Sequence, residues 1–382
     1  MKAFELQELR QGITTGLSAA AAAEAATIAL FSGNTVQQVQ VTARTGEQFI
    51  IPISQTNWEN DWVRSGVVKD AGDDPDVTDG LTVFTAVRRT ANHGIDIDGG
   101  EGIGRVTKPG LKAAVGQAAI NPVPREMITQ AIQAVCSRYG YTGGIQAVVS
   151  IPGGEQVAKR TMNARLGVIG GLSILGTTGI VRPMSNQALI DTIKAEIDVQ
   201  IASGRQQLLM MPGNYGRDFA QQVLGLGTAE AIRFANFIGE ALAHACRKGV
   251  TSITLIGHAG KLVKLAGGIM NTHSSVADCR LEIIAAHAAL MGARQQTIQQ
   301  IMNAVSSEAA IDILIAAGLN DAVWQSIKTK IDFHLEAWTA GLINLEYYVF
   351  TQEHGVLIHS QLYKQDELNG KPEEQIYRPD DG

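Results

Sequence analysis

The sequence has few cysteines and few aromatic residues, and we expect no signal peptide. Its three cysteines, Cys136, Cys246 and Cys279, lie far apart, so they match neither a disulfide framework nor the paired spacing of a zinc site. The first residues lack the apolar stretch of a signal peptide. We therefore expect reduced thiols, a cytoplasmic protein and no bound metal.

Basic charge and long apolar runs are also lacking. The formal net charge is −6 at pH 7, and no segment forms the basic stripe that nucleic-acid binding requires. The longest uncharged run that we single out, Leu166 to Val181, is shorter than the roughly 20 apolar residues that cross a bilayer. We expect neither a nucleic-acid partner nor a membrane span, and any anionic substrate must be held by local cations.

The length of 382 residues favours two domains, at about 150 residues each. Hairpin-like strand runs dominate the first half, whereas strand, glycine turn and helix alternate in the second. We predict a strand-rich α+β domain over residues 1–185, followed over residues 186–382 by an α/β domain with a parallel, Rossmann-like sheet. The sequence leaves open whether the protein forms a homo-oligomer.

An alanine-rich helix is predicted near the N-terminus, from Ser18 to Leu30. Alanine is the best helix former, a hydroxyl at Thr14, Thr15 or Ser18 can cap the start, and Gly33 stops it. The strands that we predict after it are residues 36–44, 47–53, 62–68 and 81–89.

An aspartate-rich loop lies between the last two of these strands, with five aspartates in residues 70–79. It lacks the spacing and the terminal glutamate of a calcium loop. We predict a turn-rich loop whose carboxylates bond the backbone and face a group with donors, either a ligand or a basic neighbour.

Glycine-rich loops with nearby cations mark the first half. The loop at residues 99–105 resembles a dinucleotide fingerprint, but Pro109 and Gly110 exclude the helix that should follow it. The stretch from Ile151 to Ser185 combines many glycines with flanking cations; such glycines let backbones approach one another or face a ligand. The candidate substrate-binding cations of the whole chain are Arg105, Lys108, Arg125, Lys159, Arg160, Arg165 and Lys261, and a solvated surface role is the alternative for each.

The second half repeats a strand, a glycine turn and a helix. Residues 207–211 lead into Pro212–Gly216, residues 252–256 lead into Gly257–Gly260, and a helix is predicted between them at residues 228–248. In a parallel sheet both turns would lie at the ligand crevice. The predicted cofactor-binding residues are Gly213, Asn214, Gly216, Gly257 and Gly260, and His258 is the predicted catalytic group. The alternative for a lone histidine in a turn is a structural role.

Several stretches together resemble one enzyme family. They are residues 10–16 before the alanine helix, residues 68–76, 100–105, 119–125 and 211–214, the glycine-rich central stretch, and residues 256–261. In these the chain is similar to the cobalt-precorrin-5B carbon-1 methyltransferases of anaerobic cobalamin biosynthesis, the CbiD family. The resemblance implies that S-adenosylmethionine methylates carbon 1 of a cobalt-bearing, ring-contracted tetrapyrrole to give cobalt-precorrin-6A.

That chemistry suits what the sequence offers. A methyl sulfonium is already activated, so holding both partners in line accelerates the transfer. The protein needs a cofactor crevice, cations for the substrate carboxylates and at most one base. Two other functions are weighed: a nucleotide-phosphate enzyme, which the missing G-x-x-x-x-G-K-[ST] motif counts against, and a non-catalytic tetrapyrrole carrier.

Overall fold

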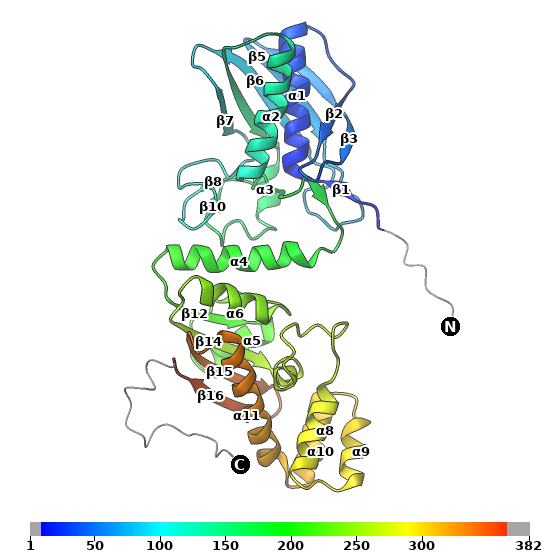
Figure 1. The fold of residues 1–382 in the computed structure, drawn as a ribbon, viewed down its shortest axis with the longest axis vertical. Helices are drawn as coiled ribbons and strands as arrows, with labels where there is room; N and C mark the ends of the chain where they lie inside the picture. Colours follow the sequence, from blue (N-terminus) through cyan, green and yellow to red (C-terminus); the bar gives the residue numbers. More distant parts are fainter. Residues whose placement is uncertain (1–8, 365–382) are drawn as a thin grey trace, which may run out of the picture. The chain divides into compact units, whose positions relative to one another are not determined.

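The computed structural model describes residues 9–364 of the chain. Its contacts divide between Asn186 and Gln187 into two compact units, which we call the N-terminal and C-terminal units (Figure 1). The expectation about a signal peptide concerns residues before 9 and so lies outside the described residues.

The alanine-rich helix α1 (Thr15–Ser32) lies in the core of the N-terminal unit. The side chain of Thr14 caps it by accepting the N–H of Leu17 at 3.2 Å, and Gly33, with a φ of 71°, ends it. Alanines on all sides of the helix are buried, because a small side chain lets neighbouring elements approach closely. Among the described residues, one helix, α1, is long and apolar enough to cross a membrane, and 72% of its span is buried inside the protein.

A five-stranded sheet packs against α1. Its order is β4 (Gln55–Glu59), β5 (Trp62–Val68), β6 (Thr82–Thr90), β9 (Gly144–Ser150) and β7 (Ile95–Gly99), antiparallel except for the β9 and β7 pair. The hydroxyl of Thr85 in β6 donates to the carbonyl of Ala19 in α1 at 2.9 Å. Helix α2 (Pro122–Arg138) lies beside α1 (Figure 1), and β2 (Gln38–Thr42) and β3 (Gln48–Pro52) form a separate hairpin. The strand-rich prediction is confirmed.

The glycine-rich stretch completes the N-terminal unit through short elements. They are α3 (Gly154–Ala158), β10 (Val168–Ile169) paired with β8 (Arg105–Val106), and β11 (Ile180–Val181) paired with β1 (Gly12–Ile13). A Cβ on Gly171 would lie 2.3 Å from the carbonyl oxygen of Gly102. Of the two roles predicted for these glycines, close approach of backbones is therefore the one seen at Gly171.

The C-terminal unit contains a sheet with parallel strands, as predicted. Its order is β13 (Ile232–Arg233), β12 (Gln207–Met211), β14 (Ser252–His258), β15 (Asn344–Thr351) and β16 (Gly355–Leu362); the first four are parallel and β16 is antiparallel. The helices are α4 (Asn186–Ala202), α5 (Asn214–Gln222), α6 (Ile238–Arg247), α7 (Ala259–Leu262) with the 3-10 turn η1 (Val263–Gly267), α8 (Arg280–Leu290), α9 (Gln295–Met302), α10 (Ser307–Ala316) and α11 (Asn320–Thr339).

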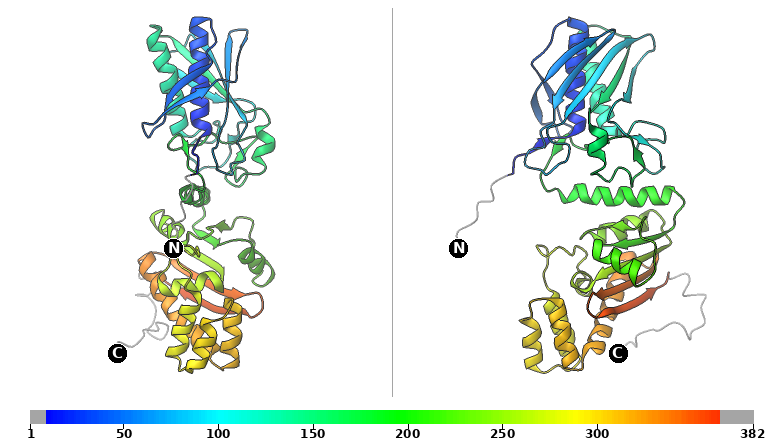
Figure 2. Two further views of the ribbon diagram at one scale, coloured as in Figure 1. Left: turned by 90° about the vertical axis from the view of Figure 1, so that its right-hand side faces the viewer. Right: turned by 180° about the vertical axis from the view of Figure 1, so that it is seen from behind.

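Helices cover both faces of this sheet (Figure 2). On one face Phe219 of α5 stacks on Phe350 of β15 with ring centroids 4.0 Å apart. On the other face lies the larger core, to which α4, α6, α8, α10 and α11 contribute.

Two details of this unit differ from the sequence prediction. The helix predicted from residue 228 begins only at Ile238, because the residues before it form the edge strand β13 and a turn in which the N–H of Phe234 bonds the carbonyl of Met211. The second glycine turn also begins later than predicted, because Gly257 and His258 are the last two residues of β14. Pairing with residues far along the chain, which local patterns do not reveal, explains both differences: β13 pairs with β12, and Gly257 and His258 pair with Val349 and Phe350 of β15.

Candidate functional site

The carboxyl ends of β12 and β14 form the centre of the candidate site. The two strands are parallel neighbours, with Met210 opposite Leu255. From β12 the chain runs to β13 on one side and then returns to β14 on the other. Such a reversal of strand order is where ligands bind in open α/β sheets.

The turn after β12 offers open backbone. No heavy atom lies within 4 Å of the place where a Cβ on Gly213 would stand, and Asn214, the first residue of α5, is exposed. Gly216 has a different role, because its Cβ would lie 3.0 Å from Met211 and 3.1 Å from the carbonyl of Ile256. It lets α5 approach the sheet.

Gly257 faces the protein core. It pairs with Val349 inside the sheet, and a Cβ on it would lie 2.6 Å from the side chain of Leu262. The prediction that Gly257 stands in a glycine turn is wrong, and its lack of a side chain serves the packing of Leu262.

His258 is the last residue of β14 and the N-cap of α7. Its Nδ1 accepts the N–H of Gly260 at 3.2 Å, and its Nε2 lies 2.9 Å from the Glu308 carboxylate. Burial lowers the pKa of His258, against the opposing effect of Glu308. A neutral ring that accepts at Nδ1 and donates from Nε2 satisfies both contacts, so neither nitrogen is available to take a proton in this arrangement.

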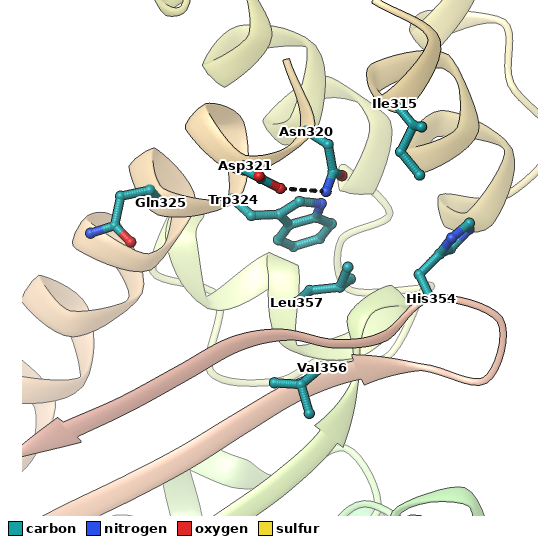
Figure 3. A pocket seen from close by; sticks show the side chains of 8 residues that line it. All are labelled: Ile315, Asn320, Asp321, Trp324, Gln325, His354, Val356 and Leu357. Carbon is teal, nitrogen blue, oxygen red and sulfur yellow. Dashed lines mark hydrogen bonds between the residues drawn. The ribbon is translucent and has the colours of Figure 1, made fainter. Parts of the chain in front are cut away.

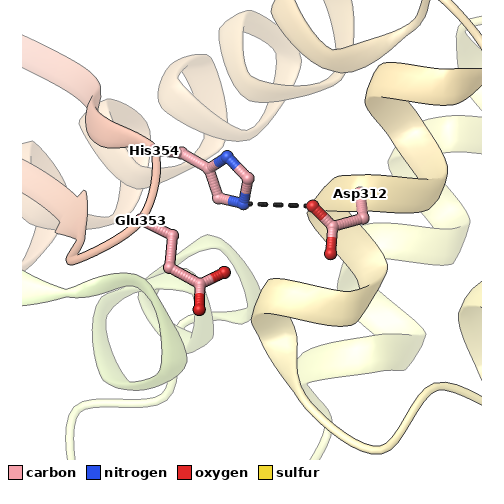
Figure 4. Close-up of side chains that lie close together, drawn as sticks. All are labelled: Asp312, Glu353 and His354. Carbon is pink, nitrogen blue, oxygen red and sulfur yellow. Dashed lines mark ion pairs between the residues drawn. The ribbon is translucent and has the colours of Figure 1, made fainter.

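Helix α10 carries a second carboxylate one turn after Glu308. Asp312 lies 3.3 Å from Nε2 of His354, which follows β15 (Figure 4). With Glu353 they form a group whose ligand atoms lie within 4.8 Å of one another. Both carboxylates are exposed, and exposed acidic groups are common without an ion, so we assign no metal to them.

A buried hydroxyl borders the turn at Gly260. Ser307, the first residue of α10, is 2% exposed, and among the described residues its Oγ has no hydrogen-bond partner. A Cβ on Gly260 would lie 3.5 Å from this oxygen and 3.8 Å from the guanidinium of Arg280. Sequence reasoning missed Ser307 and Glu308, because serines followed by an acidic residue are also the ordinary signal of a helix start.

Two predicted substrate cations bond the protein itself. Arg105 makes two hydrogen bonds to Asp98, at 2.7 and 2.8 Å, and its hydrogen bonds hold the pKa of that carboxyl below its usual range. Arg125 is half-buried and donates to the backbone carbonyls of Ile120 at 3.1 Å and Ile97 at 2.7 Å. Both arginines therefore brace the loops that carry them.

The other predicted cations of the N-terminal unit differ in exposure: Lys108 is half-buried. The stem of Lys108 passes over Gly167, which places its loop beside the segment that carries half-buried Arg165. For the ammonium of Lys108 no ion pair or hydrogen bond is found within residues 9–364. Lys159 and Arg160 are exposed. The pairing of β8 with β10 thus brings part of the predicted cation set together.

Lys261 belongs to the C-terminal unit, in α7. Its ammonium donates to Oδ1 of Asn236 at 2.7 Å and to the carbonyl of Ala235 at 3.2 Å. Burial lowers the pKa of Lys261. These bonds tie α7 to the segment between β13 and α6.

In the C-terminal unit, the parallel sheet with a reversal of strand order is the layout of α/β proteins that bind small ligands at their strand ends. Comparison of the sequence with protein-family models identifies the family. The family model described as CbiD matches residues 2–183, and the one described as CbiD, C-terminal domain, matches residues 271–361. The chain belongs to the CbiD family.

Two relatives of this chain have the same name. The chain is 48% identical over 345 residues to cobalt-precorrin-5B C(1)-methyltransferase of Ruminiclostridium cellulolyticum, covering 90% of each chain. It is 42% identical over 329 residues to the protein of that name from Methanocaldococcus jannaschii, covering 86% of this chain and 90% of the other. A crystal structure of the cobalamin biosynthesis protein CbiD from Archaeoglobus fulgidus is 28% identical, with a TM-score of 0.38, and covers 71% of this chain and 84% of that one.

Proposed function

We propose that the protein is a cobalt-precorrin-5B C(1)-methyltransferase. It transfers a methyl group from S-adenosylmethionine to carbon 1 of its cobalt tetrapyrrole and gives cobalt-precorrin-6A. The observation that carries the proposal is the 48% identity over 90% of both chains to a relative with that name. The family motifs of residues 10–125 all fall within the matched region of residues 2–183.

The proposed reaction needs positioning more than activation. The sulfonium supplies the reactive methyl group, and an electron-rich ring carbon attacks it in line with the departing thioether. Alignment of two bound partners accounts for a large part of such an acceleration. The protein then has to hold both partners and exclude competing water.

We place the cofactor at the ends of β12 and β14. Numbered along the chain, the sheet order is 2-1-3-4-5, which is the flavodoxin-like order of doubly wound sheets, with its crevice between strands 1 and 3. The Rossmann-like sheet predicted from the sequence is kept here as a proposal in this broader, doubly wound sense. Open backbone at Gly213, exposed Asn214, and the buried hydroxyl of Ser307 beside Gly260 support this assignment. The cofactor domain of this proposal is the chain after residue 185.

His258 has a positioning role in this proposal. Both of its ring nitrogens are engaged, by Gly260 and by Glu308. It therefore orients the turn that faces the cofactor, in place of the catalytic role that the sequence suggested.

We place the substrate carboxylates on cations of the N-terminal unit. The candidates are half-buried Lys108 and exposed Lys159 and Arg160, and Arg105 and Arg125 brace their own loops. A carboxylate-rich substrate gains from such groups in an acidic protein because charge-assisted hydrogen bonds are stronger than neutral ones.

Equilibrium binding tests the proposal against the two other functions. Calorimetry should show binding of S-adenosylhomocysteine, and no binding of ATP at the same concentration. Tight ATP binding would favour a nucleotide-phosphate enzyme. Binding of a cobalt corrinoid without any binding of S-adenosylmethionine or S-adenosylhomocysteine would favour a carrier.

A further inference from the structure

A pocket in the C-terminal unit shares no lining residue with the candidate site at the ends of β12 and β14. It is bordered by the end of α10, the start of α11 and the hairpin of β15 and β16 (Figure 3), and its volume is about 480 Å³. That volume lies in the range of pockets that take small organic ligands. The proposed function makes no use of it.

An unpartnered donor lines this pocket. Trp324 of α11 is only 2% exposed, and within the described residues its indole N–H has no acceptor. Figure 3 shows the ring lying between Asn320 and Leu357. Tryptophan N–H groups usually find a partner when buried, because an unpaired buried donor is costly. The pocket side is where an acceptor can reach it.

An unpartnered acceptor lies next to that donor. The Nδ2 of Asn320 donates to Asp321 at 3.1 Å, which fixes the orientation of the amide, and its Oδ1 is buried without a partner among the described residues. Asn320 and Trp324 stand four residues apart on α11, so they share one face of the helix. The pocket wall therefore presents a donor and an acceptor side by side.

We propose that this pocket binds a small planar ligand that presents a hydrogen-bond acceptor beside an N–H donor. The acceptor takes the indole N–H of Trp324, and the N–H donates to Oδ1 of Asn320. Amino-heterocycles such as adenine and primary carboxamides such as nicotinamide carry an acceptor and an N–H donor side by side. The aliphatic side chains of Ile315 and Leu357 supply apolar walls for a ring.

His354 lies at the pocket as well, where its Nε2 faces Asp312 at 3.3 Å. Together with Asp321, these groups make the surroundings of the pocket acidic. A neutral or positively charged ligand therefore fits better than an anionic one, which separates this pocket from the cations proposed for the substrate.

Calorimetry on the full chain with matched ligands tests the proposal. Adenosine and nicotinamide are the two ligands tested, because both carry an acceptor beside an N–H donor. The affinity for S-adenosylmethionine is measured as well, to test whether the adenine of the proposed cofactor binds in this pocket. Purine riboside is the control, because its ring keeps the acceptor nitrogen N1 and lacks the amino group that donates. At least one of the two ligands should bind, and purine riboside should bind at least about tenfold more weakly than adenosine.

The Trp324→Phe variant keeps an aromatic ring and removes the donor. Its affinity for the bound ligand should fall by about three- to tenfold, whereas Trp58→Phe, in exposed β4 of the other unit, should leave it unchanged. Circular dichroism shows whether both variants fold.

Three results would overturn the proposal: no binding of adenosine or nicotinamide at millimolar concentration, equal binding of adenosine and purine riboside, or unchanged affinity in folded Trp324→Phe. None of them bears on methyl transfer, which the variant should retain if the pocket serves a separate ligand. Loss of S-adenosylmethionine binding in folded Trp324→Phe would also overturn the proposal, because the cofactor would then occupy this pocket and not the ends of β12 and β14.

Discussion

At the scale of single residues, several charged groups serve the protein's own structure. The aspartate-rich loop of residues 69–80 is turn-rich, as predicted: Asp76 accepts the N–H of Thr78, and Asp79 accepts that of Ala71. Basic neighbours, one of the two donor sources predicted, face these carboxylates. Arg10 pairs with Asp70 at the surface, and the ammonium of Lys69, which is almost fully buried, pairs with Asp76 at 2.5 Å.

Loss of Lys69 should destabilise the N-terminal unit strongly. Burial would raise the pKa of Asp76, but hydrogen bonds from Lys69 and Thr78 outweigh it and keep the carboxyl ionised. Lys69→Met leaves that charge without its buried partner, so the free energy of unfolding should fall by about 3 kcal/mol in urea titrations. Arg10→Met, whose pair is exposed, should change it little. Equal effects of the two substitutions would contradict this view of the loop.

A single lysine should matter for the substrate. One charge-assisted hydrogen bond contributes roughly 1.5–3 kcal/mol, so Lys108→Ala should weaken tetrapyrrole binding about tenfold to a hundredfold at low salt. The affinity for S-adenosylmethionine should stay the same. Lys112→Ala, an exposed neighbour in the same loop, is the control. If both variants bind the tetrapyrrole like the parent protein, Lys108 is a solvated surface residue.

His258 should make the C-terminal unit sensitive to acid. Its pKa in the folded protein is lowered, so below about 6.5, the ordinary value, the unfolded chain binds more protons than the folded one. Its contribution to stability is therefore present above that pH and is lost as the pH falls toward its folded pKa. The drop in Tm between pH 7.5 and pH 5.5 should be smaller in His258→Gln than in the parent protein. An equal drop would show that another group causes the loss.

At the scale of elements, helix α10 contacts the ends of two strands at the candidate site. Glu308 bonds His258 at the end of β14, and Asp312 faces His354 after β15, so one helix face holds the ends of two neighbouring strands. Ser307 precedes both, with its hydroxyl buried and beside Gly260. The sequence of α10 indicates only a capped helix, and its role in the site depends on where it packs.

Two adjacent serines at this helix start should behave in opposite ways. Ser306 caps α10 by accepting the N–H of Ala309 at 3.1 Å, so Ser306→Ala should cost about 1 kcal/mol of stability and leave cofactor affinity unchanged. Ser307→Ala removes an unpartnered buried hydroxyl, so stability should not fall. Its affinity for S-adenosylhomocysteine should drop about three- to tenfold, measured by calorimetry beside thermal unfolding. An unchanged affinity would exclude Ser307 from the cofactor site.

At the scale of the whole molecule, local patterns predict the elements well. Strands β5 and β12 begin and end where the sequence indicates, because their apolar runs and flanking turns agree. The parallel part of the second sheet is also predicted from the repeated strand, turn and helix. The alanine helix is longer than predicted by a few residues at its start, where Thr14 proves to be the cap.

Contacts between distant residues are what the sequence does not reveal. Arg105 donates a hydrogen bond to Asp98, and His258 pairs with Glu308, fifty residues further along the chain. Nothing in the sequence motif of either residue indicates its partner. The edge strand β13 lies inside a stretch with helical composition, and sheet pairing with β12 overrides that propensity. The unpaired groups of Trp324 and Asn320 likewise emerge only from packing.

The most direct test of the proposed function is methyl transfer itself. The full-length protein is incubated anaerobically with cobalt-precorrin-5B and S-adenosylmethionine carrying a 13C-labelled methyl group, and the product is examined by mass spectrometry and 13C NMR. We predict a tetrapyrrole heavier by one labelled methyl group, with the label bonded to carbon 1 and S-adenosylhomocysteine formed in equal amount. An unchanged tetrapyrrole, or a label bonded to any other atom of the ring, would contradict the assignment.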